Sequence, residues 1–316
     1  KNLTNQNDLT QALKEKAMQQ GFYPVGVASV PGSKRMQLRT EALSRWLKAN
    51  HHADMKWMET SKRKDITQLL DGVSSVVAVG LNYHAQNKSK NEDLFIGRYA
   101  WGKDYHKVVK KRLKQVGLWL SEQRPKCKWK ICVDTSPLLD KAWAEEAGIG
   151  WIGKNSNLIN QSRGSWMAIG HLLCTEKLTP DAPAKSLCGS CEICINGCPT
   201  QAITEPFVID SKKCIAYHTI ENRSALLPIE ITQKMDKWIA GCDICQEICP
   251  WNQKPIPSST DPELLPQDWI MDITAKEALS WDDRKWEKML QGSALKRIKP
   301  WMWRRNVLST QNNSLT

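Results

Sequence analysis

The amino-acid sequence predicts a mixed α/β domain over residues 1–180, a cysteine-rich module over 181–256 and a short helical C-terminal segment over 257–316. Three observations support this division. Strand-like apolar runs alternate with amphipathic helical patterns up to about residue 180. Eight of the eleven cysteines fall between residues 188 and 249. Four prolines between residues 255 and 266 then precede the last amphipathic patterns.

The elements of the first domain follow one another regularly along the chain. Asp8 is expected to cap a helix that presents Leu9, Leu13 and Ala17 on one face and stops at Gly21. The other predicted elements are strands over 22–28, 75–81, 129–133 and 166–172, and helices over 36–49, 106–122 and about 137–147. Such alternation predicts three layers, with a sheet between two layers of helices.

Two prolines in the stretch 179–183 mark the end of this domain. Beyond the cysteine-rich module, the C-terminal segment reads as short helices that end in a basic stretch. One unit of a HEAT-like helical repeat is expected to begin near Ser280, so this segment is expected to be short or truncated relative to a full repeat domain.

The cysteine spacing predicts two 4Fe–4S clusters in a ferredoxin-like module. The cysteines stand as Cys188-x2-Cys191-x2-Cys194-x3-Cys198-Pro199, then Cys214, then Cys242-x2-Cys245-x3-Cys249-Pro250. In bacterial ferredoxins the cysteine before proline ligates the other cluster. We therefore assign one cluster to Cys188, Cys191, Cys194 and Cys249, and a second cluster to Cys198, Cys214, Cys242 and Cys245.

Other interpretations of these cysteines are weaker. A disulfide framework needs an oxidising compartment, and residues 1–21 are polar, unlike a secretory signal peptide. Zinc sites built from two Cys-x2-Cys pairs do not explain the Cys-Pro endings. We expect reduced thiols and a cytoplasmic location. The separate residues Cys127, Cys132 and Cys174 are interpreted as small buried apolar side chains.

The charge balance is basic, with 45 Lys and Arg against 33 Asp and Glu. An excess of positive charge suits a polyanionic partner, although a merely solvated basic surface is an equal alternative. Lysines at 103, 107, 110, 111 and 114 recur at three- and four-residue steps and share one predicted helix face. No run of 18 apolar residues is present, which argues against a membrane-spanning helix.

Three motifs outside the cysteines are candidates for chemistry. Asp134 follows a predicted strand, and ligands gather at the carboxyl ends of strands in open α/β sheets. Apolar neighbours can raise the pKa of such a carboxyl group and make it a proton donor, but a turn-forming Asp is an equal alternative. The glycine-rich stretch 148–157 can approach a large ligand closely or form a plain loop. His106 stands in an approximate cobalt-ligand signature that Val109 breaks, so we reject it as a cobalt ligand.

Over residues 8–310 the chain resembles the epoxyqueuosine reductases, the cobalamin- and iron–sulfur-dependent enzymes of tRNA queuosine synthesis. The resemblance is carried by short motifs throughout the chain. They are Gly97-Arg98-Tyr99-Ala100, Asp104-Tyr105-His106-Lys107, Val133-Asp134-Thr135, Gly148-Ile149-Gly150-Trp151-Ile152-Gly153-Lys154-Asn155, Cys198-Pro199-Thr200, Cys214-Ile215-Ala216-Tyr217, Thr219-Ile220-Glu221, Gly241-Cys242-Asp243 and Cys249-Pro250-Trp251-Asn252.

The resemblance implies an α/β (α+β) cobalamin-binding domain like that of reductive dehalogenases, with cobalamin bound beside the clusters. It implies reduction of epoxyqueuosine to queuosine at the wobble position of tRNAs with GUN anticodons. Two electrons and two protons are consumed and water is released. A monomeric enzyme supplied by an external low-potential electron donor is expected.

The resemblance also implies roles for individual residues. Asp134 matches the proton donor, and Asn222 and Arg223 match tRNA contacts. The residues expected to contact cobalamin are Trp57, Gly97, Arg98, Asp134, Asn157, Leu158, Ile169, Ala216, Tyr217, Gly241 and Cys242.

Two other classes of function remain as alternatives. A cobalamin-dependent reductive dehalogenase acting on a small molecule would share the cofactors, but a basic helix face has no purpose with a neutral substrate. A non-catalytic electron-transfer subunit would need neither Asp134 nor a 180-residue domain ahead of the clusters.

Overall fold

The computed structural model describes residues 5–86 and 93–311. Its central sheet has the order β1–β2–β7–β4, and every neighbouring pair is antiparallel. The strands are β1 (Val25–Ser29), β2 (Ser75–Asn82), β4 (Trp129–Cys132) and β7 (Met167–Cys174). All four predicted strands are present with shifted ends. Because β2 and β4 both run antiparallel to β7, their carboxyl ends lie at the same edge of the sheet.

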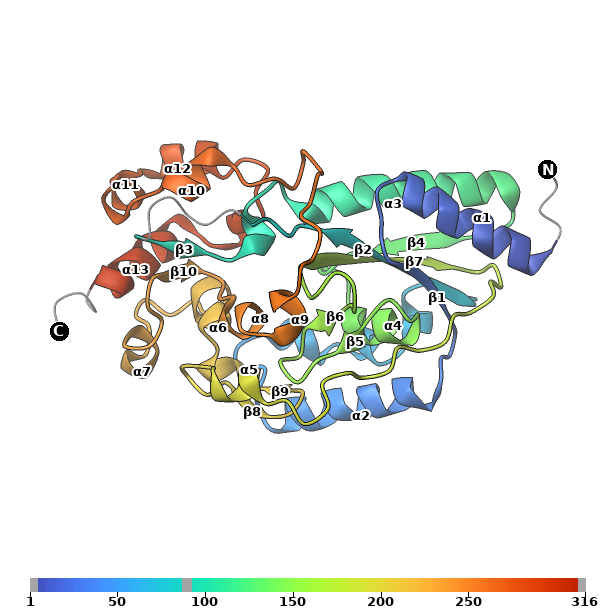
Figure 1. Ribbon diagram of the computed structural model, residues 1–316, viewed down its shortest axis with the longest axis horizontal. Helices are drawn as coiled ribbons and strands as arrows, with labels where there is room; N and C mark the ends of the chain where they lie inside the picture. The colour runs from blue at the N-terminus through green and yellow to red at the C-terminus, as the bar shows by residue number, and fades with distance from the viewer. Residues whose placement is uncertain (1–4, 87–92, 312–316) are drawn as a thin grey trace.

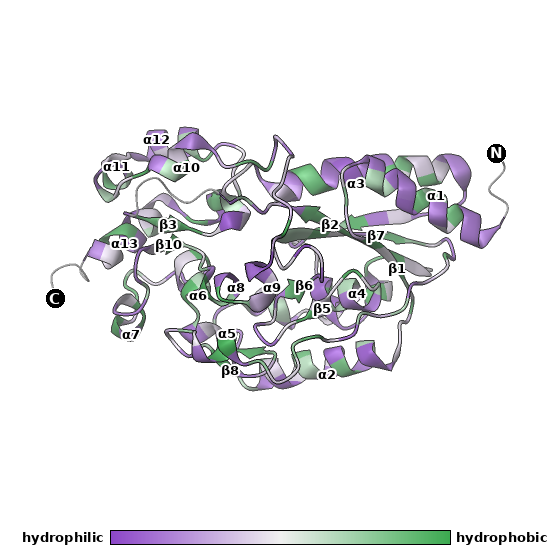
Figure 2. Ribbon diagram, in the orientation of Figure 1, coloured by the Kyte–Doolittle hydropathy of each residue, from purple (hydrophilic) through white to green (hydrophobic). Residues whose placement is uncertain are grey.

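Helices cover both faces of this sheet, which confirms the predicted three layers (Figure 1). One face packs against α1 (Gln6–Gln19) and α3 (Tyr105–Gln123), and the other packs against α4 (Asp140–Glu146), which in turn contacts α2 (Lys34–Lys48). Every residue of β2 except Asn82 is buried, and β7 is buried except for the half-buried Ile169. Figure 2 shows β2 as a predominantly hydrophobic strand, as expected for a strand with helices on both faces.

Helices α1 and α4 differ most from their predicted starts. Asn5, rather than Asp8, caps α1 by accepting a hydrogen bond from the Asn7 amide, and Asp8 lies in the first turn. Helix α4 begins at Asp140 instead of near residue 137. The preceding residues form a turn in which the Leu138 amide donates to the Ser136 carbonyl. A loop therefore separates β4 from α4, and it carries Asp134.

The cysteine-rich module consists of short elements around the cysteine loops. They are α5 (Ile193–Asn196), β8 (Ile203–Glu205), β9 (Val208–Ile209), α6 (Ile215–Ile220), α7 (Ile229–Thr232), β10 (Trp238–Ala240), α8 (Ile244–Glu247) and α9 (Pro250–Gln253). Strand β10 pairs in parallel with β3 (Phe95–Ile96), so a segment from the first part of the chain adds a strand to this module.

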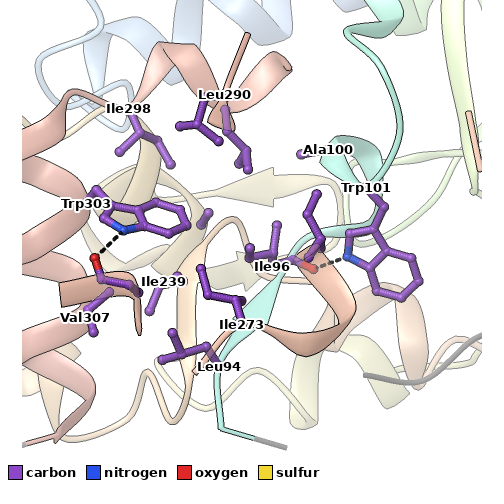
Figure 3. Close-up of a cluster of buried hydrophobic side chains, with 14 of the residues drawn as sticks. Leu94, Ile96, Ala100, Trp101, Ile239, Ile273, Leu290, Ile298, Trp303 and Val307 are labelled. Carbon is purple, nitrogen blue, oxygen red and sulfur yellow. Dashed lines mark hydrogen bonds between the residues drawn. The ribbon is translucent and has the colours of Figure 1, made fainter. Parts of the chain in front are cut away.

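The C-terminal segment is helical as predicted, with α10 (Asp268–Asp272), α11 (Ala275–Ser280), α12 (Asp283–Met289) and α13 (Pro300–Gln311). Its core also includes residues 94–101 and 239–240 (Figure 3). Trp101 belongs to this core and donates its indole N–H to the Ile96 carbonyl, 2.7 Å away. The rings of Trp281 and Trp303 stack with centroids 5.5 Å apart. The predicted boundaries at 180 and 256 remain a prediction, because residues 94–101 pack with the C-terminal segment.

The remaining elements are short. They are the hairpin of β5 (Trp151–Ile152) and β6 (Leu158–Ile159), and the 3₁₀ turns η1 (Lys56–Glu59), η2 (Ser61–Arg63), η3 (Ile66–Gln68), η4 (Arg98–Ala100), η5 (Ser211–Lys213) and η6 (Ala294–Arg297). Among the residues that the structure describes, no helix combines the length and the apolar character needed to cross a membrane.

Candidate active site and cluster-binding module

Four cysteines from two distant loops surround a single cavity of about 90 Å³. They are Cys188, Cys191, Cys194 and Cys249, and the rest of the lining is Lys154, Asn155, Ile159, Leu187, Pro250 and Trp251. Burial raises the pKa of Cys194 to about 11, and the charges of the other three thiols add to this effect. Four sulfurs that share one cavity fit a cubane cluster, which stabilises them as thiolates.

The other four cysteines form a second group. Burial raises the pKa of Cys245, and the charges of Cys214, Cys242 and Cys198 act in the same direction. Burial likewise raises the pKa of Cys242, with contributions from Cys214 and Cys198. These two groups are the ones that the crossed assignment predicts, although cluster ligation by each residue remains a prediction.

The cysteine groups differ from a single-ion site. Within residues 5–86 and 93–311, no three His, Cys, Asp or Glu side chains converge closely enough to hold one metal ion. A cubane does not need such convergence, because each of its four cysteine thiolates binds a different iron.

Asp134 lies in the loop after β4 and has a left-handed backbone conformation, with φ of +46°. Asp tolerates this conformation better than most residues. Its carboxylate accepts a hydrogen bond from His106 Nε2 at 3.0 Å, and the other ring nitrogen of His106 bonds to Asp104 at 2.7 Å. His106 is the second residue of α3, whose N-cap is Asp104. The start of α3 thus delivers a histidine to the loop of Asp134.

The electrostatics of this group differ from the expectation that Asp134 has a raised pKa. Burial by itself would raise the pKa of Asp134. The hydrogen bond and charge of His106, together with the charges of Lys141 and Arg63, outweigh burial and lower the pKa of Asp134. Burial would lower the pKa of His106, yet Asp104 and Asp134 raise it to about 9. At neutral pH the proton therefore resides on His106, and Asp134 is a carboxylate that is 63 % exposed.

Lys141 connects Asp134 with the second cysteine group. Its ammonium donates to the Ser156 carbonyl at 2.6 Å, and the charges of Asp134, Asp140 and Cys245 all act on it. The residue after Ser156 is Asn157, whose side-chain amide lies 3.9 Å from Cys245 Sγ. Lys141 therefore links the loop of Asp134, through its charge, to the loop that contacts the second cysteine group.

The residues predicted to contact cobalamin occupy different environments. Trp57 is 48 % exposed, and the Arg63 guanidinium lies 5.0 Å from the centre of its ring. Tyr217 is buried and its hydroxyl contacts Asp54. Ala216 precedes Tyr217 in α6 and is half-buried. Trp57 is thus a large flat side chain with free surface, as a corrin contact requires.

Other residues predicted to contact cobalamin pack against neighbouring residues of the protein. Leu158 is buried and Ile169 packs against the same core. Gly97 and Gly241 flank Tyr99, whose ring would lie 3.1 Å from a Cβ atom on either glycine. This close packing explains both glycines without a ligand, and their assignment to cobalamin remains a prediction.

Arg98 is a structural bridge between the two parts of the site. Its guanidinium lies between the rings of Trp101 and Trp166, at 5.0 and 4.7 Å from their centres, and pairs with Asp243 and Glu247. Asp243 follows the predicted ligand Cys242. Arg98 therefore fixes this cluster loop against the first domain, and a cofactor contact would be an additional role.

The predicted tRNA contacts also differ from each other. Asn222 is buried, and its side chain bonds to His218 and to the Ser224 amide. Arg223 reaches the C-terminal segment, where it contacts Met302 and donates to the Arg297 carbonyl. The side chain of Asn222 is therefore committed to the fold, and its contact with tRNA remains a prediction.

Sequence reasoning missed two contributors to the site. The sequence around His106 indicates a broken cobalt-ligand signature and a family motif, but not a proton donor. Its position two residues after Asp104 is a helix-start pattern, and this is the signal that points to a hydrogen bond between the two residues. Arg297 pairs with Glu221 through two hydrogen bonds of 2.9 and 2.6 Å, and the charge of Asp134 acts on it. No local signal indicates that a residue near the C-terminus approaches Asp134.

Comparison with known proteins identifies close relatives along nearly the whole chain. A family model described as epoxyqueuosine reductase QueG, DUF1730, matches residues 63–135, and a 4Fe–4S double cluster binding domain matches 187–252. The epoxyqueuosine reductase of Prochlorococcus marinus strain NATL2A is 59 % identical over 96 % of this chain and 98 % of its own length.

Solved structures agree with these relatives. A crystal structure of epoxyqueuosine reductase with an epoxyqueuosine-modified tRNA-Tyr stem loop is 26 % identical, with a TM-score of 0.88 over 96 % of this chain and 81 % of that one. The Bacillus subtilis enzyme is 25 % identical, with a TM-score of 0.82 over the same shares, and is described with its catalytic aspartate loop swung out of the active site.

Proposed function

The chain belongs to the epoxyqueuosine reductase family, and we propose that it reduces epoxyqueuosine in the anticodon of tRNA to queuosine. The reaction removes the epoxide oxygen as water and consumes two protons and two electrons. One observation carries the proposal: Lys141, on which the charge of Asp134 acts, donates to the Ser156 carbonyl, and the next residue, Asn157, contacts Cys245 Sγ of a predicted cluster. Protons and electrons can therefore meet at one substrate.

The proton path begins at His106. Its imidazolium holds a proton at Nε2 against Asp134, while Asp104 fixes the ring through the other nitrogen. The carboxylate of Asp134 is 63 % exposed, so a substrate can reach it. As negative charge develops on the epoxide oxygen, Asp134 donates to it the proton that it receives from His106.

The two predicted clusters would hold the electrons that the reaction consumes. Cobalamin, when bound, would supply the redox-active metal centre for reduction of the carbon–oxygen bond. The chain fits a large flat cofactor, because the ring of Trp57 is half exposed and packs against Arg63, whose charge also acts on Asp134. Asn157, Leu158, Ile169, Ala216, Tyr217, Gly97, Arg98, Gly241 and Cys242 are the further proposed contacts.

The nucleic-acid substrate agrees with the charge of the protein. The net charge of +12 favours binding to phosphates. Arg223 donates to the Arg297 carbonyl, and the charge of Asp134 acts on Arg297, so these two basic residues are associated with the site. A relative of the same fold is known with an epoxyqueuosine-modified tRNA stem loop. We propose that GUN-anticodon tRNAs are the substrates, and that a monomeric enzyme acts on them in the cytoplasm with an external low-potential donor.

The decisive experiment is anaerobic turnover of tRNA that carries epoxyqueuosine, using protein reconstituted with iron, sulfide and cobalamin. We expect conversion to queuosine, detected by mass spectrometry of the digested tRNA. Asp134→Asn should retain both clusters and cobalamin but lose most of the activity. A chain that leaves the epoxide intact yet dehalogenates a small aryl halide would overturn the proposal in favour of the dehalogenase alternative.

A further inference from the structure

The two predicted cluster sites differ in the side chains that surround their sulfurs. The hydroxyl of Thr200 lies 3.6 Å from Cys198 Sγ, and the side-chain amide of Asn157 lies 3.9 Å from Cys245 Sγ. Both cysteines belong to the second group. In the described part of the chain, the sulfurs of Cys188, Cys191, Cys194 and Cys249 have no side-chain hydrogen bond.

The direction of these hydrogen bonds follows from the chemistry of the bound cluster. A thiol could donate to Thr200, but a thiolate that ligates iron has no proton and can only accept. Thr200 is 8 % exposed, so few water molecules can replace its hydroxyl. The Ala202 amide adds a main-chain donor to Cys198 Sγ at 3.3 Å. In the cluster-bound protein, Cys198 therefore accepts two hydrogen bonds.

Asn157 is held in place by a neighbouring contact. Asn155 is buried and donates its side-chain amide to the Cys245 carbonyl at 3.1 Å, while its side-chain oxygen accepts from the Asn157 amide. The glycine-rich loop of the first domain is thereby fixed on the Cys245 loop. The side-chain amide of Asn157, from the first domain, is thus held next to Cys245, a predicted cluster ligand of the cysteine-rich module.

Main-chain donors reach both groups. The amides of Trp251 and Asn252 bond to Cys249 in the first group. In the second group, the amides of Ala216 and Tyr217 bond to Cys214, that of Ile244 to Cys242 and that of Ala202 to Cys198. Each group therefore has main-chain donors, as cysteine loops generally provide. The side-chain donors Thr200 and Asn157 distinguish the second group.

We propose that Thr200 and Asn157 raise the reduction potential of the cluster ligated by Cys198, Cys214, Cys242 and Cys245 above that of the other cluster. Hydrogen bonds to cluster sulfurs stabilise the reduced, more negative state and so raise the potential. Electrons then pass downhill from the cluster of Cys188, Cys191, Cys194 and Cys249 to the cluster near Lys141 and Asp134. Thr200 and Asn157 are positioning residues that act through the cluster.

The test is a redox titration of the reconstituted protein, followed by electron paramagnetic resonance. Thr200→Val removes the hydroxyl while keeping the shape of the side chain. We expect the higher of the two midpoint potentials to move to a more negative value and the lower one to stay. Thr200→Ser should restore the native value. Thr310→Val is the matched control, because this buried threonine donates to the Val307 carbonyl in α13.

Asn157→Leu provides an independent variant that should shift the same midpoint. Iron analysis should find eight irons per chain in every variant. Unchanged midpoints in variants that hold eight irons would overturn the proposal, as would an equal shift of both midpoints. Loss of one cluster from both variants, with Thr310→Val intact, would also overturn it and indicate a purely structural role. None of these readouts uses the substrate, so failure here is distinguishable from failure of the proposed function.

Discussion

His106 and Asp134 form a hydrogen-bonded pair of 3.0 Å between the start of α3 and the loop after β4. The pKa of His106 is raised to about 9, and that of Asp134 is lowered. The negative charge of Asp134 stabilises the protonated imidazole of His106, and the positive charge of His106 stabilises the carboxylate of Asp134. The pair is thus an imidazolium and a carboxylate at neutral pH, and the proton available for the substrate is stored on nitrogen.

This charge state predicts the pH dependence of turnover. His106 carries its proton below a pKa of about 9. Activity should therefore hold across neutral pH and fall as pH rises through about 9. The stabilising effect of the raised His106 pKa follows the same sign and is lost as pH rises from the unfolded histidine pKa of about 6.5 through about 9. The lowered pKa of Asp134 gives the opposite limb, so the effect of the pair is also lost in acid as pH falls through the folded Asp134 pKa.

The measurement is a pH profile of single-turnover rates at saturating tRNA. His106→Gln should lower the rate roughly 100-fold or more and abolish the alkaline limb, since general acid catalysis contributes about that factor. Lys110→Gln, on the same helix, serves as a control for lost charge. A His106→Gln enzyme that keeps the native profile would show that the proton comes from elsewhere.

Replacing Asp134 separates the chemistry from the cofactors. Asp134→Asn keeps the size of the side chain but cannot relay a proton from His106. We expect native absorbance from the clusters and cobalamin, with a rate reduced by roughly 100-fold or more. The pKa of His106 should fall as well, because Asp134 contributes to raising it. NMR of labelled histidine would record this fall, and a His106 pKa that stays near 9 would contradict the pairing.

The elements that local patterns specify were predictable. The strand at Ser75–Asn82 is a continuous apolar run between turn signals, and the repeat of Leu9, Leu13 and Ala17 defines one face of α1. The cysteine loops were predictable for a similar reason, since a cubane requires closely spaced ligands. Long-range pairing was not predictable. The parallel pairing of β10 with β3 joins residues about 140 positions apart and has no local signal.

The predicted shift of the Asp134 pKa has the wrong direction because it too depends on a long-range contact. Apolar neighbours in sequence, Leu138 and Leu139, suggested a raised pKa. The structure instead places the ring of His106, 28 residues earlier in the chain, against the carboxylate. A pKa depends on the charges that surround a group in space, so the sequence neighbours of Asp134 could not determine its sign.

The crossed assignment of clusters predicts which cluster each cysteine supports. Cys249 follows Cys245 by four residues, yet its sulfur lines the cavity of Cys188, Cys191 and Cys194. Cys249→Ser should therefore perturb the cluster of the first group and leave the higher-potential cluster of the second group intact. Iron analysis and electron paramagnetic resonance would show this, with Cys127→Ser as a control at a cysteine outside both groups. Loss of the higher-potential signal alone would contradict the crossed assignment.

Asn306 joins the C-terminal segment to the loop that carries Cys242. Its side chain is fully buried and donates to the carbonyls of Thr219 and Ile239, each at 2.8 Å. The Thr219 hydroxyl in turn accepts from the Gly241 amide, next to Cys242. Removing the Asn306 amide would leave two buried carbonyls without their donor, and each such group costs about 1–3 kcal/mol.

Asn306→Ala should consequently lower the free energy of unfolding by about 2 kcal/mol or more, and calorimetry should show a fall in Tm of roughly 4 °C or more. We expect a second effect at the clusters, because the loop of Gly241 and Cys242 loses its support: the second cluster should be lost faster on exposure to a chelator, while the first cluster is retained. Leu308→Ala is the control, since this residue of α13 is 54 % exposed. Equal chelation rates for both clusters in Asn306→Ala would show that α13 stabilises the fold without supporting the Cys242 loop.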